Sequence, residues 1–262
     1  MIKRISVFLV IAAVALAGVP LPGASASAAE IHVISSGGFT PAFRELAPEY
    51  EKQSGNKTAL ELGASMGATP TSIPSRLERG EPADVLLMVG YALDQLIKTG
   101  RALPGSRVDL SRSSIGMAVR AGAPKPDIST VEAFKRTLLS AKSIAYSDSA
   151  SGVYLSTDLF KRLGIADQVK DKSRMIPGDP VGGVVAKGEA EIGFQQISEL
   201  KPIPGIDIVG PIPAEVQQVT IYAAGIAANS KDPAAAKTLI DFLASPGAAT
   251  AIRVTGMETM RP

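Results

Sequence analysis

Short apolar runs alternate with helix-forming segments along this chain, and this alternation limits its fold more than any other feature. Strands are predicted at residues 58–62 and 84–89, and helices at 73–79 and 91–98. A second series of the same kind begins after a Pro/Gly-rich link at 121–127. Strands that alternate with helices form mostly parallel sheets with helices on both faces. The sequence therefore predicts an α/β fold.

Two longer apolar strands, 115–119 and 219–228, join the two series and predict two lobes. Lobe 1 is expected to contain residues 29–111 and 222–262, and lobe 2 residues 112–221 with the hinge strands. Each lobe is expected to be a doubly wound sheet. A chain that crosses twice between lobes leaves a cleft where helix N-termini from both sides meet.

The N-terminus has the features of a secretory signal peptide. Lys3 and Arg4 precede an apolar run, 5–19, and small residues suited to cleavage follow it. That run is too short to span a bilayer stably. The chain has no cysteine, so it has neither a disulfide nor a lipid-anchored cysteine. The sequence predicts that residues 1–28 are removed and that the mature protein is free in the periplasm, without a membrane anchor.

Charge and missing motifs exclude several function classes. The chain has 27 basic and 25 acidic residues, and without Lys3 and Arg4 the two charges balance. No basic cluster with interleaved aromatic residues suggests nucleic-acid binding. One histidine and no cysteine argue against a transition-metal site. Serine-hydrolase, NTPase and dinucleotide-binding fingerprints are also missing from the sequence.

The turn at 35–38 contains two serines and two glycines between a buried strand and a helix start. Thr40 suits the N-cap of that helix, and Pro41 suits its first position. The turn leaves backbone N–H groups free near a helix N-terminus, which is a natural anion site. A tight turn that needs glycine and nothing more would explain the same residues.

Similar polar loops recur at 64–72, 147–154, 178–183 and 194–196. Each has a simple structural explanation, because Asp, Ser and Gly are common in caps and turns. All of them follow predicted strands, however, and together they favour a polar ligand cleft. Two arginines near these loops, at 76 and 174, could clamp a carboxylate, although solvated surface arginines would look the same.

The chain resembles the periplasmic molybdate-binding proteins, which have the type II solute-binding fold. The resemblance rests on the 35–38 turn, on Gly80-Glu81-Pro82-Ala83-Asp84-Val85, on 147–154 and on the final helices. It implies a two-lobed periplasmic solute-binding protein with its ligand between the lobes. The segments implied to hold the ligand are 35–38, 69–72, 149–152, 179–181 and Phe194.

Two departures from that family pattern suggest a different, larger ligand. Phe194, which cannot donate a hydrogen bond, stands where the family has a tyrosine, and Gly38 stands where it has a serine. The segment 64–72 is also longer and contains Pro70. Losing two donors while enlarging a loop favours a ligand bigger than an oxyanion.

Three segments, 35–38, 146–154 and 193–196, are more similar to a catalytic branch of the family, the aconitate isomerases. This likeness implies a cofactor-independent isomerase that transposes a C=C bond, interconverting trans- and cis-aconitate by an allylic proton shift. A base removes a methylene proton and a proton returns at the other carbon, while N–H groups and hydroxyls stabilise the carbanion. The alternative is a non-catalytic binding protein that delivers molybdate or a small carboxylate to an ABC permease.

On the isomerase hypothesis, the predicted base is Asp148 or Asp179, because desolvation raises the pKa of a carboxyl toward a useful range. Arg76 or Arg174 would offset the charge of a trianion. A monomer that binds a small anion is expected, with no metal and no cofactor. The other predicted ligand-binding residues are Ser35, Ser36, Gly37, Gly38, Thr69, Thr71, Ser72, Ser149, Ser151, Val181, Phe194 and Gln195.

Overall fold

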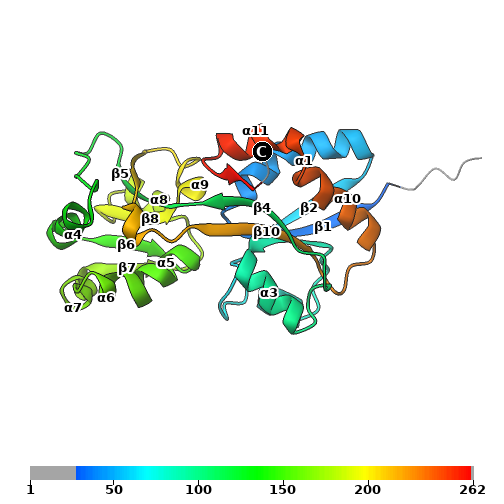
Figure 1. Cartoon of the computed structure of the whole chain (residues 1–262), viewed down its shortest axis with the longest axis horizontal. Coiled ribbons are helices and arrows are strands. Elements are labelled where there is room, and N and C mark those ends of the chain that lie inside the picture. The colour runs from blue at the N-terminus through cyan, green and yellow to red at the C-terminus, as the bar shows by residue number, and fades with distance from the viewer. Residues whose placement is uncertain (1–27, 261–262) are drawn as a thin grey trace, which may run out of the picture.

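The computed structural model of the chain describes residues 28–260 and contains two β-sheets that lie side by side along the long axis (Figure 1). The predicted signal peptide, 1–28, lies outside the described residues except for its last residue. Within 28–260, no helix is both long enough and apolar enough to cross a membrane. The fold is α/β, as the alternation of strands and helices predicts.

The first sheet has six strands in the order β11-β4-β10-β3-β1-β2. The strands β1, β2 and β3 are parallel, and β10 runs antiparallel to β3 and β4. All five residues of β3 are buried, which places this strand in the core. The strands are β1 (Glu30–Ser35), β2 (Lys57–Leu62), β3 (Val85–Val89), β4 (Val108–Ser113), β10 (Thr220–Ile226) and β11 (Glu258–Thr259).

Helices cover both faces of the first sheet. Figure 1 shows α1, α10 and α11 on one face and α3 on the other. The longest of them, α1, buries Phe43 and Leu46 on one side and ends at Gly55, whose φ of 77° suits a glycine C-cap. These helices are α1 (Thr40–Ser54), α3 (Gly90–Lys98), α10 (Pro233–Leu243) and α11 (Ala249–Val254). The short helix α2 (Ile73–Glu78) lies between β2 and β3 in the chain.

The second sheet has five strands in the order β7-β6-β8-β5-β9, with its own apolar core. Phe134 and Phe194 pack edge to face in that core, with ring centroids 5.9 Å apart. The strands are β5 (Ile115–Arg120), β6 (Ile144–Ser147), β7 (Ser173–Ile176), β8 (Ile192–Gln196) and β9 (Ile206–Pro211). The helices are α4 (Val131–Ser140), α5 (Ala150–Tyr154), α6 (Phe160–Arg162), α7 (Ala166–Val169), α8 (Val181–Ala186) and α9 (Ile197–Leu200).

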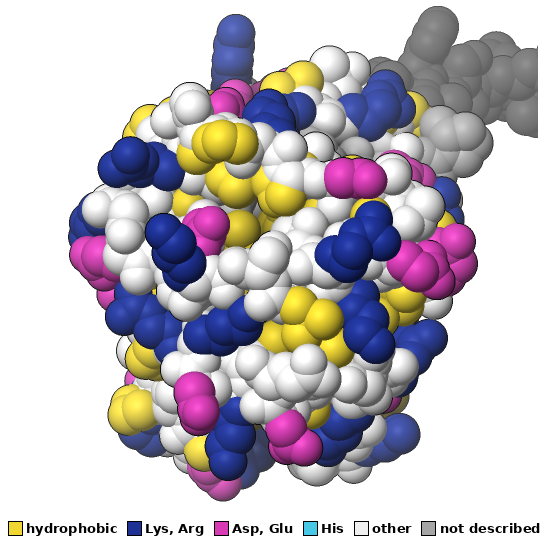
Figure 2. Space-filling view, turned by 90° about the vertical axis from the view of Figure 1, so that its left-hand side faces the viewer, with side chains coloured by type: hydrophobic (Ala, Val, Ile, Leu, Met, Phe, Trp, Pro, Cys, Tyr) yellow, Lys and Arg dark blue, Asp and Glu magenta, His cyan; other side chains and the backbone are white. Residues whose placement is uncertain are grey.

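The chain passes from the first sheet to the second between β4 and β5, and returns between β9 and β10. The predicted hinge strands 115–119 and 219–228 correspond to β5 and β10. At the exposed end of the second sheet, Lys and Arg side chains are spread among acidic and uncharged residues (Figure 2). The charges seen on that face form no single basic stripe.

Two local predictions in the second half differ from the structure. Ser129 and Glu132 predict a capping box for α4, but Thr130 is the N-cap and accepts the Ala133 N–H at 3.1 Å. Threonine is also a favourable N-cap residue, and the helix begins one residue later than the capping box predicts. The segment 154–163, closed by Gly164, also predicts a helix, but this helix begins earlier, at Ala150, and its middle is a π turn over 155–159.

Candidate functional site

A cavity of about 450 Å³ lies between the two sheets and is lined by residues from both. It opens where the parallel strands β1, β6 and β8 end, which is the usual place for ligands in α/β proteins. Its volume lies in the range of small-molecule sites. The geometry therefore supports the polar cleft that the recurring strand-end loops predict.

Thr40 braces the 35–38 turn rather than capping α1. The helix includes Thr40, its N-cap is Phe39, and no side chain makes the capping hydrogen bond. The Thr40 hydroxyl instead lies 2.9 Å from the Ser36 carbonyl and 3.0 Å from the Ser35 hydroxyl, to both of which it donates. The sequence-based N-cap is thus wrong, because the hydroxyl points back into the turn.

The 35–38 turn offers unused hydrogen-bond donors to the cavity. The hydroxyl of Ser36 is buried and has no partner among the described residues. Within the same residues, the backbone N–H groups of Gly37 and Gly38 make no hydrogen bond. Buried polar groups are nearly always paired, so the unpaired hydroxyl of the buried Ser36, which lines the cavity, points to a ligand.

Glu199 reaches this turn from the opposite side of the cavity. It lies on α9, and an added Cβ at Gly37 would overlap its Oε1 atom, so carboxylate and turn are in close contact. Its Oε2 atom is buried without a partner in the described structure. Burial raises the pKa of Glu199 to about 7. The Gln196 N–H and Gln195 side chain oppose this rise, and nearby Asp148 adds to it.

Tyr222 brings a phenol to the same place from β10. Its ring and hydroxyl occupy the space that a Cβ at Gly38 would need, so the glycine makes room for the tyrosine. Burial raises the pKa of Tyr222 well above its usual value, and the neighbouring Glu199 and Tyr91 add to the shift. The phenol therefore stays protonated. Although Phe194 cannot donate, the cavity does contain a tyrosine hydroxyl.

The structure brings half of the sequence-predicted site residues to the cavity. They come from four loops that lie far apart in the chain and from the end of β8. Serine, glycine and carboxylate groups dominate this set. The residues are Ser36, Gly37, Gly38, Thr71, Asp148, Ser149, Asp179 and Gln195.

The two predicted bases differ in how they are held. Asp148 accepts the N–H of Gly178 at 3.2 Å, so it ties the loop after β6 to the loop after β7. Beside it, the Ser147 hydroxyl lies 3.0 Å from that of Ser149. Asp179 is exposed and hydrogen-bonds to none of the described residues.

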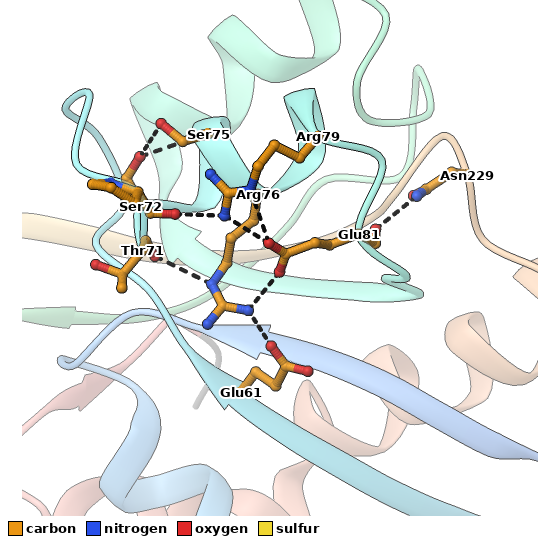
Figure 3. Close-up of polar contacts among 9 residues, drawn as sticks. Glu61, Thr71, Ser72, Ser75, Arg76, Arg79, Glu81 and Asn229 are labelled. Carbon is orange, nitrogen blue, oxygen red and sulfur yellow. Dashed lines mark hydrogen bonds and ion pairs between the residues drawn. The ribbon is translucent and has the colours of Figure 1, made fainter.

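Arg76 and Arg174 do not line the cavity. Figure 3 shows the Arg76 guanidinium between two glutamates, paired with Glu61 and at 2.8 Å from Glu81. Arg174 lies 3.5 Å from Glu189 on the surface. Tertiary ion pairs that no local pattern reveals therefore hold both arginines away from the ligand.

Arg44 is the basic residue that the cavity lining contains. It lies in the second turn of α1, is exposed, and makes no ion pair within residues 28–260. The sequence does not single out Arg44, because an exposed arginine in an amphipathic helix is usually a solvated surface residue.

The remaining predicted residues support the walls instead of lining them. Val181 donates its N–H to the Gln195 side chain at 3.0 Å, and Phe194 lies in the second core. Ser72 caps α2 by accepting the Ser75 N–H. Ser35, Thr69 and Ser151 also lie outside the cavity lining.

Comparison with known proteins places the chain in a family. The sequence profile described as bacterial extracellular solute-binding protein matches residues 31–258. The chain belongs to this family. This solute-binding protein is 53% identical to aconitate isomerase of a Pseudomonas species over 250 residues, which cover 95% of each chain.

More distant relatives share the fold. The molybdate-binding protein ModA of Azotobacter vinelandii is 26% identical over 250 residues, covering 91% of this chain and 94% of that protein. The solved structure of the Azotobacter vinelandii periplasmic molybdate-binding protein covers 88% of this chain and 99% of its own, with a TM-score of 0.70 at 22% identity. The two-lobed solute-binding fold, which the resemblance implies, is therefore confirmed.

Proposed function

We propose that this solute-binding protein is an aconitate isomerase, which interconverts trans- and cis-aconitate in the cavity between its sheets. The observation that carries the proposal is the 53% identity to aconitate isomerase along 95% of both chains. The molybdate-binding relative is only half as similar, at 26% identity. The segments that resemble the isomerase branch, 35–38 and 146–154, also contribute residues to the cavity.

The cavity fits a tricarboxylate better than a small oxyanion. A trianion needs several donors at separate points, and the cavity offers the hydroxyl of Ser36, the N–H groups of Gly37 and Gly38, and the guanidinium of Arg44. Ser149 supplies a further hydroxyl from the opposite wall. A space of about 450 Å³ accommodates a substrate with three carboxylates spread around a short carbon chain.

Isomerisation needs no further reagent in this proposal. The proton that leaves one carbon is balanced by the proton added at the other, so the reaction is redox-neutral. Donors along the walls stabilise the negative charge that develops on the substrate carboxylates. We place the activity in the periplasm, on the strength of the signal features in residues 1–28 and of the extracellular family.

The test is a turnover experiment with the chain that lacks residues 1–28. The purified protein is mixed with trans-aconitate in D2O without added metal, and NMR follows the appearance of cis-aconitate. We expect turnover with deuterium in the carbon skeleton. Absence of turnover, together with tight binding of molybdate or of a small carboxylate, would favour the alternative, a transport protein that delivers its ligand to an ABC permease.

A further inference from the structure

Three carboxylates line the cavity: Asp148, Asp179 and Glu199. We propose that Glu199 is the acid–base catalyst of the isomerisation, removing the methylene proton of trans-aconitate and returning a proton to the other end of the allylic system. This inference rests on the proposed function and names the group that performs its central step. It differs from the prediction made from the sequence, which favours the two aspartates.

The position of Glu199 supports this role. It extends from α9, on the side of the second sheet, and its carboxylate lies against Gly37 in the turn of the first sheet. The unpaired hydroxyl of Ser36 and the phenol of Tyr222 line the same part of the cavity. A substrate carboxylate held by the 35–38 turn would therefore place its neighbouring carbon beside Glu199.

The unpaired oxygen of Glu199 also supports its role as the acid–base catalyst. Its Oε2 atom is buried and accepts no hydrogen bond from any described residue. A buried carboxylate oxygen without a hydrogen-bond donor lowers the stability of the folded state, and natural proteins keep such groups where function needs them. An oxygen that accepts no hydrogen bond has its lone pairs free to take a proton from carbon.

The aspartates fit the role less well. One oxygen of Asp148 already accepts the Gly178 N–H at 3.2 Å and thereby joins two loops. Asp179 is exposed and makes no hydrogen bond to the described residues, so no contact holds it toward a substrate carbon. Burial raises the pKa of Glu199 to about 7, so both of its protonation states are populated at neutral pH, as acid–base catalysis requires.

The proposed step balances in atoms and charge. The Glu199 carboxylate takes a proton from the methylene carbon, the C–H bond breaks, and its electron pair enters the allylic system and the adjoining carboxylate. The double bond shifts by one position. The protonated Glu199 exchanges its proton with solvent and then donates a proton to the other terminal carbon, so a new C–H bond forms and the carboxylate is regenerated. The Tyr222 phenol and the turn N–H groups face the developing negative charge.

The groups around Glu199 determine how its ionisation responds to pH. Asp148 disfavours the carboxylate, whereas the Gln196 N–H and the Gln195 side chain favour it. The Tyr222 phenol is neutral. Arg44 and Asp179 line the same cavity with opposite charges.

The experiment compares isosteric variants in the turnover assay. For Glu199→Gln we expect kcat to fall about 1,000-fold, the usual scale of lost acid–base catalysis, while affinity for trans-aconitate stays within about threefold. Asp148→Asn and Asp179→Asn should keep kcat within about tenfold. Glu215→Gln, an exposed acid in the second half of the chain, is the matched control and should behave as wild type.

The outcomes separate the two proposals. If the wild type turns over and Glu199→Gln keeps more than a tenth of its kcat, or if an aspartate variant loses as much as Glu199→Gln should, the assignment of Glu199 is wrong. If the wild type itself is inactive, the isomerase function fails and the assignment with it.

A second variant covers the case in which Glu199→Gln does not fold. The wild-type kcat/KM should fall as pH drops through about 7, because protonated Glu199 cannot accept a proton. Glu199→Asp withdraws the carboxylate by one methylene, so kcat should fall and the midpoint of this pH dependence should move. An unchanged midpoint in Glu199→Asp would overturn the proposal.

Discussion

Ser36 carries a hydroxyl that has no hydrogen-bond partner within residues 28–260, so its removal should affect ligand binding and protein stability differently. We expect Ser36→Ala to leave the melting temperature unchanged or slightly raised, because no intramolecular hydrogen bond is lost. Affinity for trans-aconitate should fall about 10- to 100-fold, since a hydrogen bond to a charged group is worth about 1.5–3 kcal/mol. Thermal unfolding and calorimetric titration measure the two effects.

Ser173 provides a matched control for that prediction. Its hydroxyl is also buried without a hydrogen-bond partner among the described residues, but it lies on β7 outside the cavity lining. Ser173→Ala should therefore leave the affinity for trans-aconitate unchanged. An equal loss of affinity in both variants would mean that Ser36 does not contact the ligand.

Glu199 should make stability depend on pH in a direction unusual for a carboxyl group. Burial raises its pKa in the folded protein from 4.5 to about 7, so the folded state binds more protons than the unfolded state between these values. Stability from this group is therefore lost as pH rises through that window, by up to about 3 kcal/mol. Glu199→Gln should match wild type near pH 4.5 and exceed it at pH 8.

Denaturant unfolding of both proteins across this pH range measures the difference. The prediction fails if Glu199→Gln and wild type differ by the same free energy at every pH. A variant that is more stable but inactive would fit a group retained for function at a cost in stability.

At the scale of elements, the contact between α9 and the 35–38 turn depends on Gly37. Its φ is not in the positive range, so an alanine is compatible with the backbone, but an alanine Cβ would overlap Glu199 Oε1. We expect Gly37→Ala to displace the Glu199 carboxylate and lower kcat about 100-fold. The enzyme assay and thermal unfolding together measure this change.

Gly183 is the matched glycine. It lies in α8, has no positive φ, and its added Cβ would meet nothing within 4 Å. Gly183→Ala should keep wild-type kcat and gain about 0.5–1 kcal/mol of stability from a better helix former. If Gly37→Ala is equally active, the 35–38 turn does not position Glu199.

The lengths of the elements also explain why the sequence predicts the strands and helices better than the residues of the candidate site. Longer strands and helices have a hydrophobic period that burial imposes, so β3 and α3 lie within one residue of their predicted bounds. The α9 helix is a single turn, Ile197–Leu200, too short to show any period, and it carries Glu199. Local sequence also does not reveal tertiary ion pairs. The partner of Arg76, Glu61, lies 15 residues away on another element.

On the scale of the whole molecule, both sheets contribute residues to the cavity. A ligand that contacts both walls should therefore stabilise both lobes together. Two crossings of the chain between the sheets are predicted from the apolar strands alone, and the structure contains them. The arrangement of the two sheets and the two crossings does not determine which ligand binds. The identity of the ligand depends on the few groups that the crossings bring face to face.

Ligands of different size should therefore differ in how strongly they stabilise the protein. Trans-aconitate carries three carboxylates on a carbon chain, whereas molybdate is a compact tetrahedral ion, and the cavity presents Ser36 from the first sheet and Ser149 from the second. At about 100 times its Kd, a ligand adds about 2.7 kcal/mol of stability. At equal concentration, we expect trans-aconitate to raise the melting temperature more than molybdate does.

Arg44 should account for part of that stabilisation, because it is the basic side chain in the cavity lining. Arg44→Gln should reduce the shift with trans-aconitate, while Arg253→Gln, an exposed arginine on α11 outside that lining, should not. The comparison is made at fixed ionic strength, since salt screens exposed charges. A larger shift with molybdate, or equal shifts in both arginine variants, would show that the cavity is not built around a tricarboxylate.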